Sequence, residues 1–185
     1  MLYPVPAVMV SCGTYGGESD IITIAWAGTV CSDPPMISIS VKPSRYSYHI
    51  IKETGEFAVN LVSEELTAVM DTCGVRSGRD CSKWELCRLT QEQGSHVNCP
   101  LIAESPVQIE CRVISETDLG SHTMFVGRVL AVHADETYMR ADGRLDLEAA
   151  RLVAYSHGTY HALGKRIGTF GYSVRKRKKK KNVKK

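Results

Sequence analysis

Two long alternating runs joined by a short turn constrain the fold of this chain more than any other feature. Residues 107–117 and 123–133 alternate largely between apolar and polar side chains, which is the pattern of a β-strand. The five residues between the runs, DLGSH, include Gly120, which is free to adopt the positive φ of a turn. The sequence therefore predicts a long antiparallel hairpin.

Further strand-like segments and two short helical segments surround this hairpin. The expected strands cover residues 7–12, 21–27, 36–41 and 56–62. The expected helices run from a cap at Ser44 to Gly55 and from a cap at Ser63 to Gly74. Many strands with few helices favour a mainly β fold, an antiparallel barrel with a few short helices, over repeated βαβ units.

The segment PPMISISVKPSRYSYHIIK, residues 34–52, carries hydroxyl groups and cations but no carboxylate. If Ser44 caps a helix, the free amides of its first turn lie beside the guanidinium of Arg45 and the hydroxyl of Ser47. Such a group of donors favours a phosphate. The alternative is an ordinary capped surface helix with a solvated arginine. The chain has neither a G-x-G-x-x-G nor a P-loop motif, so a nucleotide would bind on a β scaffold.

The charge is divided unevenly along the chain. Nine of the 23 Lys and Arg residues lie in residues 174–185, which contain no acidic residue. The other 14 lie in residues 1–173 together with all 20 acidic residues. Residues 1–173 therefore carry a net charge of about −6. We expect one domain over 1–173 and a basic, disordered tail over 174–185. An acidic domain argues against nucleic-acid binding, although the tail alone is able to tether the protein to an anionic surface.

The cysteines and the apolar runs bear on location. The seven cysteines form an odd set without a C-x-x-C pair, which favours free thiols over a zinc ribbon or a disulfide scaffold. No apolar run reaches the length of a membrane span, and the first residues lack the pattern of a signal peptide. We therefore expect a cytoplasmic protein that does not contact the membrane.

Five segments, in order along the chain, resemble the flavin reductase-like family and, within it, flavoredoxin-type proteins. They are ITIAWAGTVCSDPPMISISVKPSRYSYHIIKETGEFAVNLVS, SGRDCSKWE, SPVQIECRV, GSHTMFVGRVLAV and YHALGKRIGTFGYS. The resemblance implies the FMN-binding split barrel, an antiparallel β-barrel that usually forms a homodimer with the flavin near the interface. It also implies an oxidoreductase that moves hydride or electrons between a reduced nicotinamide (NADH or NADPH), or another donor, and flavin, with FMN expected before FAD.

The resemblance also implies roles for individual residues. Arg45 and Ser47 match the turn on the phosphate side of the flavin. Lys83, in the SKW segment, is expected to reach the phosphate or the ring oxygen O2, although Ser82 stands where the family often has aspartate. His122 matches a histidine beside the nicotinamide pocket. The segment that resembles the lining of the flavin ring and ribityl chain consists of Trp26, Ala27, Gly28, Thr29, Val30, Cys31 and Ser32.

Several alternatives stay open from the sequence. A tryptophan in an apolar strand is often a core residue, and Lys83 and His122 are the kinds of residue that are often solvated. The domain is also suited to being a non-enzymatic FMN-binding electron carrier or storage module. His157 and His161 would share a face if their segment were helical, but no third metal ligand accompanies them, so we expect no metal.

Overall fold

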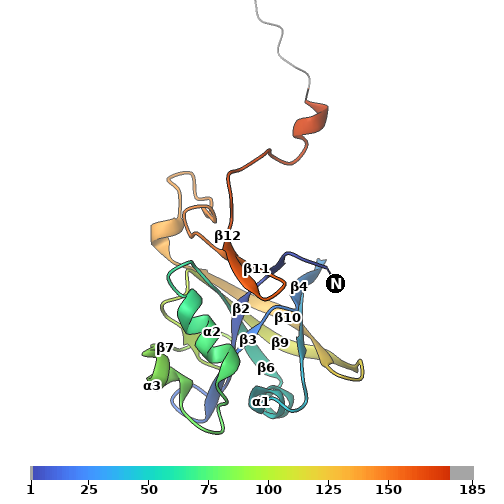
Figure 1. The fold of residues 1–185 in the computed structure, drawn as a ribbon, viewed down its shortest axis with the longest axis vertical. Helices are drawn as coiled ribbons and strands as arrows, with labels where there is room; N and C mark the ends of the chain where they lie inside the picture. The colour runs from blue at the N-terminus through green and yellow to red at the C-terminus, as the bar shows by residue number, and fades with distance from the viewer. Residues whose placement is uncertain (1, 176–185) are drawn as a thin grey trace, which may run out of the picture.

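The computed structural model describes residues 2–175, which form antiparallel sheets with three short helices (Figure 1). The strands of the main sheet are β2 (Val8–Gly13), β3 (Ser19–Ile24), β4 (Ala27–Ser32), β5 (Pro35–Val41), β6 (Glu56–Leu61), β9 (Val107–Asp118) and β10 (Thr123–Ala134). Their order in the sheet is β3-β2-β6-β9-β10-β5-β4. The shorter strands are β1 (Val5–Pro6), β11 (Val153–Ser156) and β12 (Thr159–Ala162) in a second sheet, and β7 (Gln91–Glu92) paired with β8 (Leu101–Ile102). The prediction of a mainly β, antiparallel structure is confirmed.

The main sheet curls on itself because its two edge strands are consecutive in the chain. Only Ala25 and Trp26 separate β3 from β4, so the chain bends there from one edge of the sheet to the other. The N–H of Ser40 in β5 donates to the C=O of Trp26 at 3.0 Å, which extends the β4–β5 ladder to the bend. The bend at residues 25–26 is therefore a corner of the barrel.

The predicted hairpin of β9 and β10 is confirmed. Thr123 pairs with Asp118 at one end of the ladder, and Gly120 in the turn has a φ of 90°. The register shifts next to Gly127, where a Cβ atom would lie 2.5 Å from the ring of Phe57. The backbone of β10 therefore lies so close to the ring of Phe57 at this position that only glycine fits.

Strand β2 is buried on both faces because two apolar clusters meet on it. One cluster fills the barrel and includes Val10 and Phe57. The other includes Met9 and lies beneath the helices α2 (Thr67–Val75) and α3 (Lys83–Cys87). The helices therefore cover the outside of the barrel next to β2 and β3.

The first predicted helix is present as α1 (Tyr46–Thr54), but its predicted cap is wrong. Arg45 occupies the N-cap position instead of Ser44, and no side chain bonds to the free amides there. The end of the helix is as predicted, because Gly55 adopts the left-handed conformation with φ 66°. The first turn of α1 is instead held by a side-chain contact, because the hydroxyl of Ser47 donates to the carboxylate of Asp20 on β3.

The second predicted helix is α2, and its predicted cap at Ser63 is also wrong. Ser63 pairs as a β-bridge with Leu152, which keeps its backbone out of the helix. Its C=O accepts the N–H of Leu66, the residue at the N-cap position. The third helix, α3, was not predicted; Ser82 caps it by accepting the N–H of Glu85.

The helix that would align His157 and His161 is not formed. Both residues lie on the hairpin of β11 and β12. The ring of His157 stacks on Tyr3 with centroids 5.6 Å apart, and the Nε2 atom of His161 lies 2.7 Å from the hydroxyl of Thr159. The reason for expecting a shared histidine face is therefore removed.

The segment after β12 runs away from the barrel and ends in η2 (Tyr172–Val174) (Figure 1). Two of its apolar side chains, Ile167 and Phe170, are 95% and 103% exposed. The predicted basic tail begins at residue 174, and all but its first two residues lie outside the described part. Among the helices of residues 2–175, none combines the length and apolar character that crossing a membrane requires.

Candidate functional site

An aromatic cavity of about 340 Å³ opens at the barrel corner. Its walls come from β3, from the corner itself, from β5 and from α2, and the hairpin of β11 and β12 covers one side. The side chains that give it its aromatic and apolar character are Tyr3, Ile22, Ile24, Trp26, Val75, Tyr155 and Tyr160. The cavity suits a flat, largely apolar group that stacks on aromatic rings.

Trp26 and His122 form one wall of the aromatic cavity. Their ring centroids lie 4.6 Å apart, and the Nδ1 atom of His122 lies 2.9 Å from the hydroxyl of Ser121. Burial, and then the nearby ammonium of Lys42, lower the pKa of His122 below its ordinary value. The imidazole therefore stays neutral at pH 7 and can both donate and accept a hydrogen bond. Trp26 is 43% exposed, so it is a cavity residue and not a core residue.

A second, cationic cavity of about 320 Å³ adjoins the first. The two cavities share Ile22, Lys42, Arg45 and Gly74 in their linings. The cations of the second cavity are Lys42, Arg45, Arg76, Arg79 and Lys83, against the single carboxylate of Asp20. Within residues 2–175, Lys83 alone among these cations has a carboxylate within 4.0 Å. The cationic cavity therefore has an excess of positive charge available to an anion.

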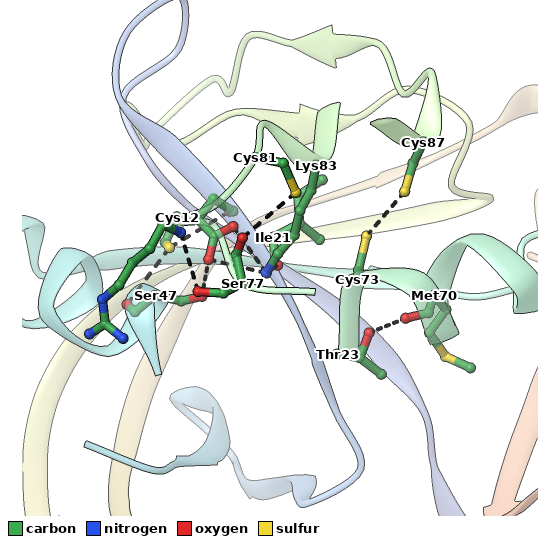
Figure 2. Close-up of polar contacts among 12 residues, drawn as sticks. Cys12, Ile21, Thr23, Ser47, Met70, Cys73, Ser77, Cys81, Lys83 and Cys87 are labelled. Atoms are coloured by element: carbon green, nitrogen blue, oxygen red, sulfur yellow. Dashed lines mark hydrogen bonds and ion pairs between the residues drawn. The ribbon is translucent and has the colours of Figure 1, made fainter. Parts of the chain in front are cut away.

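The floor of the cationic cavity is a buried polar network that includes Ser47 and Lys83 (Figure 2). The Nζ atom of Lys83 lies 3.1 Å from Asp20 and donates to the C=O of Ile21 at 2.5 Å. The hydroxyl of Ser47 donates to the same carboxylate at 2.5 Å. The side chains of Asp20, Ser47 and Lys83 are all nearly inaccessible to solvent. Because Ser47 lies on α1, Asp20 on β3 and Lys83 on α3, their network connects these three elements.

This network changes what the sequence suggested for two predicted residues. The ammonium of Lys83 is neither solvated nor near the aromatic cavity, because it is held by Asp20 below the cationic cavity. Ser47 directs its hydroxyl proton to the same carboxylate. The two residues therefore shape and charge the floor of the cationic cavity, and the prediction that Lys83 reaches the phosphate or the ring oxygen O2 of a flavin stays a prediction from the family resemblance.

Arg45 lies where the two cavities meet. Its side chain is exposed and lines both of them. Its own N–H donates to the C=O of Lys42 at 3.0 Å, so the expectation that this amide is free is wrong. The guanidinium is the group that Arg45 offers, and it is positioned to bind an anion next to the aromatic cavity.

Residues 27–32 are not brought to either cavity. They form β4, an edge strand on which Gly28, Thr29 and Val30 are exposed. The thiol of Cys31 donates to the C=O of Asp33, and Ala27 packs against the barrel core. The assignment of Ala27, Gly28, Thr29, Val30, Cys31 and Ser32 to a cofactor stays a prediction from the family resemblance.

The loop between α2 and α3 supplies site residues that were not predicted. Arg76, Ser77, Gly78 and Arg79 all line the cationic cavity. A Cβ atom on Gly78 would lie 2.5 Å from a carboxylate oxygen of Asp20, so glycine lets this loop approach the polar network. The signal in the sequence was the run RSGR, two arginines around small residues, directly after a helix.

The chain is similar to known proteins over most of its length. Residues 1–164 match the family model described as flavin reductase like domain. An uncharacterized protein of Archaeoglobus fulgidus is 31% identical over 157 residues, which cover 85% of this chain and 86% of the relative. The solved flavoredoxin of Desulfovibrio vulgaris (Miyazaki F) is 30% identical with a TM-score of 0.88, and the likeness covers 95% of each chain. A protein with a split barrel domain from Shewanella frigidimarina NCIMB 400 is 22% identical with a TM-score of 0.81, covering 91% of this chain and 86% of that one. These likenesses confirm the predicted split-barrel fold.

Proposed function

Because the chain belongs to the flavin reductase-like family, we propose that it is an oxidoreductase that binds FMN and transfers hydride or electrons between a reduced nicotinamide, or another donor, and that flavin. One observation carries the proposal: an aromatic cavity and a cationic cavity meet at Arg45. FMN has the same two parts, a flat aromatic ring system and a phosphate, joined by a short polar chain.

The donor set of the cationic cavity fits a phosphate dianion. Lys42, Arg45, Arg76 and Arg79 approach it from two segments of the chain and have no carboxylate partner within residues 2–175. A guanidinium group can donate two parallel N–H hydrogen bonds to two oxygens of one phosphate, and an excess of cations compensates the negative charge of the ligand. In this proposal the four side chains hold the phosphate, and the network of Asp20 and Lys83 keeps the floor of the cavity rigid.

The aromatic cavity is proposed to hold the ring system and the donor that approaches it. When bound, FMN supplies the hydride acceptor, and the chain orients the reactants and excludes water. Trp26 offers an exposed indole face for stacking. His122 contributes a neutral imidazole beside it, which can hydrogen-bond the carboxamide of a nicotinamide without adding charge.

The phosphate role is tested by comparing FMN with riboflavin, which lacks the phosphate. We expect Arg45→Ala to weaken FMN binding by about 1.5–3 kcal/mol, the size of a charge-assisted hydrogen bond, and to leave riboflavin binding unchanged. Arg45→Lys restores part of the loss. Arg128→Ala, an exposed arginine on β10 outside both cavities, is the matched control. Equal FMN affinity for the wild type and Arg45→Ala in a flavin-fluorescence titration would refute this role.

Anaerobic mixing separates an enzyme from an electron carrier or storage module. The FMN-loaded protein is mixed with NADH, NADPH or a reduced ferredoxin, and the flavin absorbance is followed in time. Fast bleaching by a nicotinamide identifies a reductase. Fast bleaching by ferredoxin alone identifies an electron carrier, and slow bleaching by all three identifies a storage protein. Titration with FAD in the same series decides between the two flavins.

We also propose a homodimer, in which the apolar arm of residues 163–175 packs on a second copy. Ile167 and Phe170 on this arm are fully exposed in the single chain, and Leu163 and Val174 are more than half exposed. Exposed apolar side chains in a row favour association, and an isologous contact would cover both arms at once. Sedimentation at micromolar concentration should give twice 20.4 kDa for the wild type and less for a double variant, Ile167→Asp with Phe170→Asp. A monomeric wild type with bound flavin contradicts the dimer.

A reducing compartment, the cytoplasm, is the proposed location. All seven cysteines are free thiols in the structure, four of them buried. Free thiols persist where glutathione and thioredoxin keep them reduced. Fractionation of the native host with an antibody to the protein tests this placement.

A further inference from the structure

Two cysteines of the helices beside the cationic cavity place their sulfur atoms in contact. Cys73 on α2 and Cys87 on α3 have Sγ atoms 3.8 Å apart, and the two side chains point toward one another (Figure 2). A disulfide bond is about 2.05 Å long, so the two sulfur atoms need to approach by only about 1.75 Å for a bond to form. Cys73 is buried and lines the cationic cavity, whereas Cys87 is half-buried.

The position of the pair along the chain gives the contact a consequence. A bond between Cys73 and Cys87 would close a loop that contains six residues of the cationic cavity: Gly74, Arg76, Ser77, Gly78, Arg79 and Lys83. Without the bond, α2 and α3 are joined here by apolar packing, by the non-covalent contact of the two thiols and by the loop. The oxidation state of the two sulfurs therefore decides how firmly one wall of the cavity is held.

We propose that Cys73 and Cys87 form a reversible dithiol–disulfide site that senses low-molecular-weight disulfides and fixes the wall of the cationic cavity when oxidised. The thiolate of Cys87 attacks one sulfur of the small disulfide and expels one thiol. The sulfur of Cys73 then attacks the mixed disulfide at Cys87 and expels the second thiol. In total, two protein thiols become one protein disulfide, and one small disulfide becomes two small thiols. A small dithiol reverses both steps.

The surroundings of the two sulfurs set the order of these steps. Burial, and then the adjacent thiol of Cys87, raise the pKa of Cys73 to about 12, so Cys73 is a poor first nucleophile. Cys87 is the more accessible sulfur and meets the reagent first. The other half-buried cysteine of this region, Cys81, points its thiol at the C=O of Ser77 at 3.7 Å, so it does not compete for Cys73.

The first test counts thiols and maps the bond. Native protein is incubated with excess oxidised glutathione, denatured with N-ethylmaleimide, and analysed by mass spectrometry of the intact chain and its peptides. We expect the wild type and Cys81→Ser to lose two alkylatable thiols to a bond between residues 73 and 87, which dithiothreitol restores. Cys73→Ser and Cys87→Ser should form no such bond. A glutathione adduct on Cys87 without the cross-link, a different pairing, or seven reactive thiols in the wild type would overturn the proposal.

The second test measures what the bond does. The cross-link restricts the unfolded chain, so the oxidised wild type should melt about 5–10 °C higher than the reduced protein, and Cys87→Ser should show no difference between the two conditions. The effect on the cavity rests on the proposed function: FMN affinity should differ at least about 3-fold between the two states, and equal affinities would overturn the coupling. If neither state binds FMN while the disulfide forms, the proposed function fails and the dithiol assignment stands.

Discussion

The indole ring of Trp26 and the imidazole ring of His122 lie 4.6 Å apart at an angle of 44°, although most of the barrel separates them along the chain. The ladder between β5 and β10 brings them together, because it pairs Thr123 with Val41 and so places the turn residue His122 beside Lys42. One cation, one imidazole and one indole therefore meet at the barrel corner.

The first prediction concerns the proton on His122. Because Lys42 contributes to the low pKa of this histidine, Lys42→Ala should raise that pKa toward its ordinary value of about 6.5. Lys52→Ala, which removes a surface ammonium paired with Glu116, is the control and should leave it unchanged. NMR titration of the imidazole protons measures both. An unchanged pKa in Lys42→Ala would show that burial alone sets it.

The same shift predicts how His122 affects stability with pH. The folded pKa lies below the unfolded pKa, so the unfolded chain binds the proton first as the pH falls through about 6.5. Wild-type protein should therefore lose more unfolding free energy between pH 7.5 and 5.5 than His122→Gln. Urea unfolding at the two pH values gives both differences, and equal losses contradict the prediction.

The buried pair of Lys83 and Asp20 predicts a large effect on stability. Lys83→Met leaves a carboxylate buried without its cation, which should lower the unfolding free energy by about 3–5 kcal/mol. Adding Asp20→Asn to this variant should recover part of the loss. Lys52→Met breaks an exposed pair and should cost less than about 1 kcal/mol. Urea denaturation orders the three variants, and a loss for Lys83→Met as small as that for Lys52→Met would falsify the structural role of the pair.

The close approach of the β10 backbone to Phe57 predicts that a side chain at Gly127 is destabilising. The added methyl group of Gly127→Ala would lie 2.5 Å from the ring of Phe57 and 2.9 Å from the Cβ atom of Cys111. Overpacking of this kind costs about 1–3 kcal/mol, and Phe57→Leu in the same chain should relieve part of it. Gly28→Ala, where the methyl group meets nothing within 4 Å, is the matched control. Similar melting temperatures for the two alanine variants would show that the strands adjust freely.

The carboxylate of Glu110 predicts an acid-dependent loss of stability. It is fully buried and accepts the N–H groups of Ser95, His96 and Val97, and one of its oxygens lies 2.5 Å from Nε2 of His133. Burial alone would raise its pKa, but these bonds outweigh burial and lower it. Its stabilisation is thus complete above the ordinary pKa of glutamate and is lost as the pH falls through the lower folded value.

Replacing Glu110 by glutamine isolates this effect. The NH2 group of the new amide would face the backbone N–H groups that the carboxylate accepts. Glu110→Gln should therefore lower the unfolding free energy by about 1.5–3 kcal/mol at pH 7 and by less as the pH approaches 3. Glu116→Gln, which removes an exposed carboxylate, is the control. Chemical denaturation across this pH range measures the difference, and a constant difference at every pH rules out the carboxylate as its cause.

Strands could be predicted from the sequence because their evidence is local. Residues 107–117 and 123–133 alternate within themselves, and a short turn with Gly120 leaves one way to join them. The predicted cap at Ser63 was wrong because a tertiary contact competes with capping. Ser63 is taken into a β-bridge with Leu152, far along the chain.

The candidate site was predictable only in part, for the same reason. Arg45 was recognisable because the segment around it excludes carboxylates. The burial of Lys83 depends on its pairing with Asp20, which lies 63 residues earlier, and no periodic pattern in the sequence predicts a pairing over that separation. Arg76 and Arg79 enter the site because α2 packs on β3 and aims the following loop at α1, which is a property of the assembled barrel.

The corner at Ala25 and Trp26 has a consequence for how the protein folds. The strands on either side of it, β3 and β4, are the two opposite edges of the sheet, so the strands are joined into one sheet only after β10 pairs with β5, nearly half the chain earlier. Such distant pairings form late and make folding slow. The residues that line the cationic cavity all lie between positions 20 and 83, before β9 and β10, whereas the aromatic cavity also needs His122 from the turn between β9 and β10. A refolding chain should therefore form its cationic cavity before its aromatic cavity is complete. A ligand that occupies both cavities would stabilise the pairing of β10 with β5.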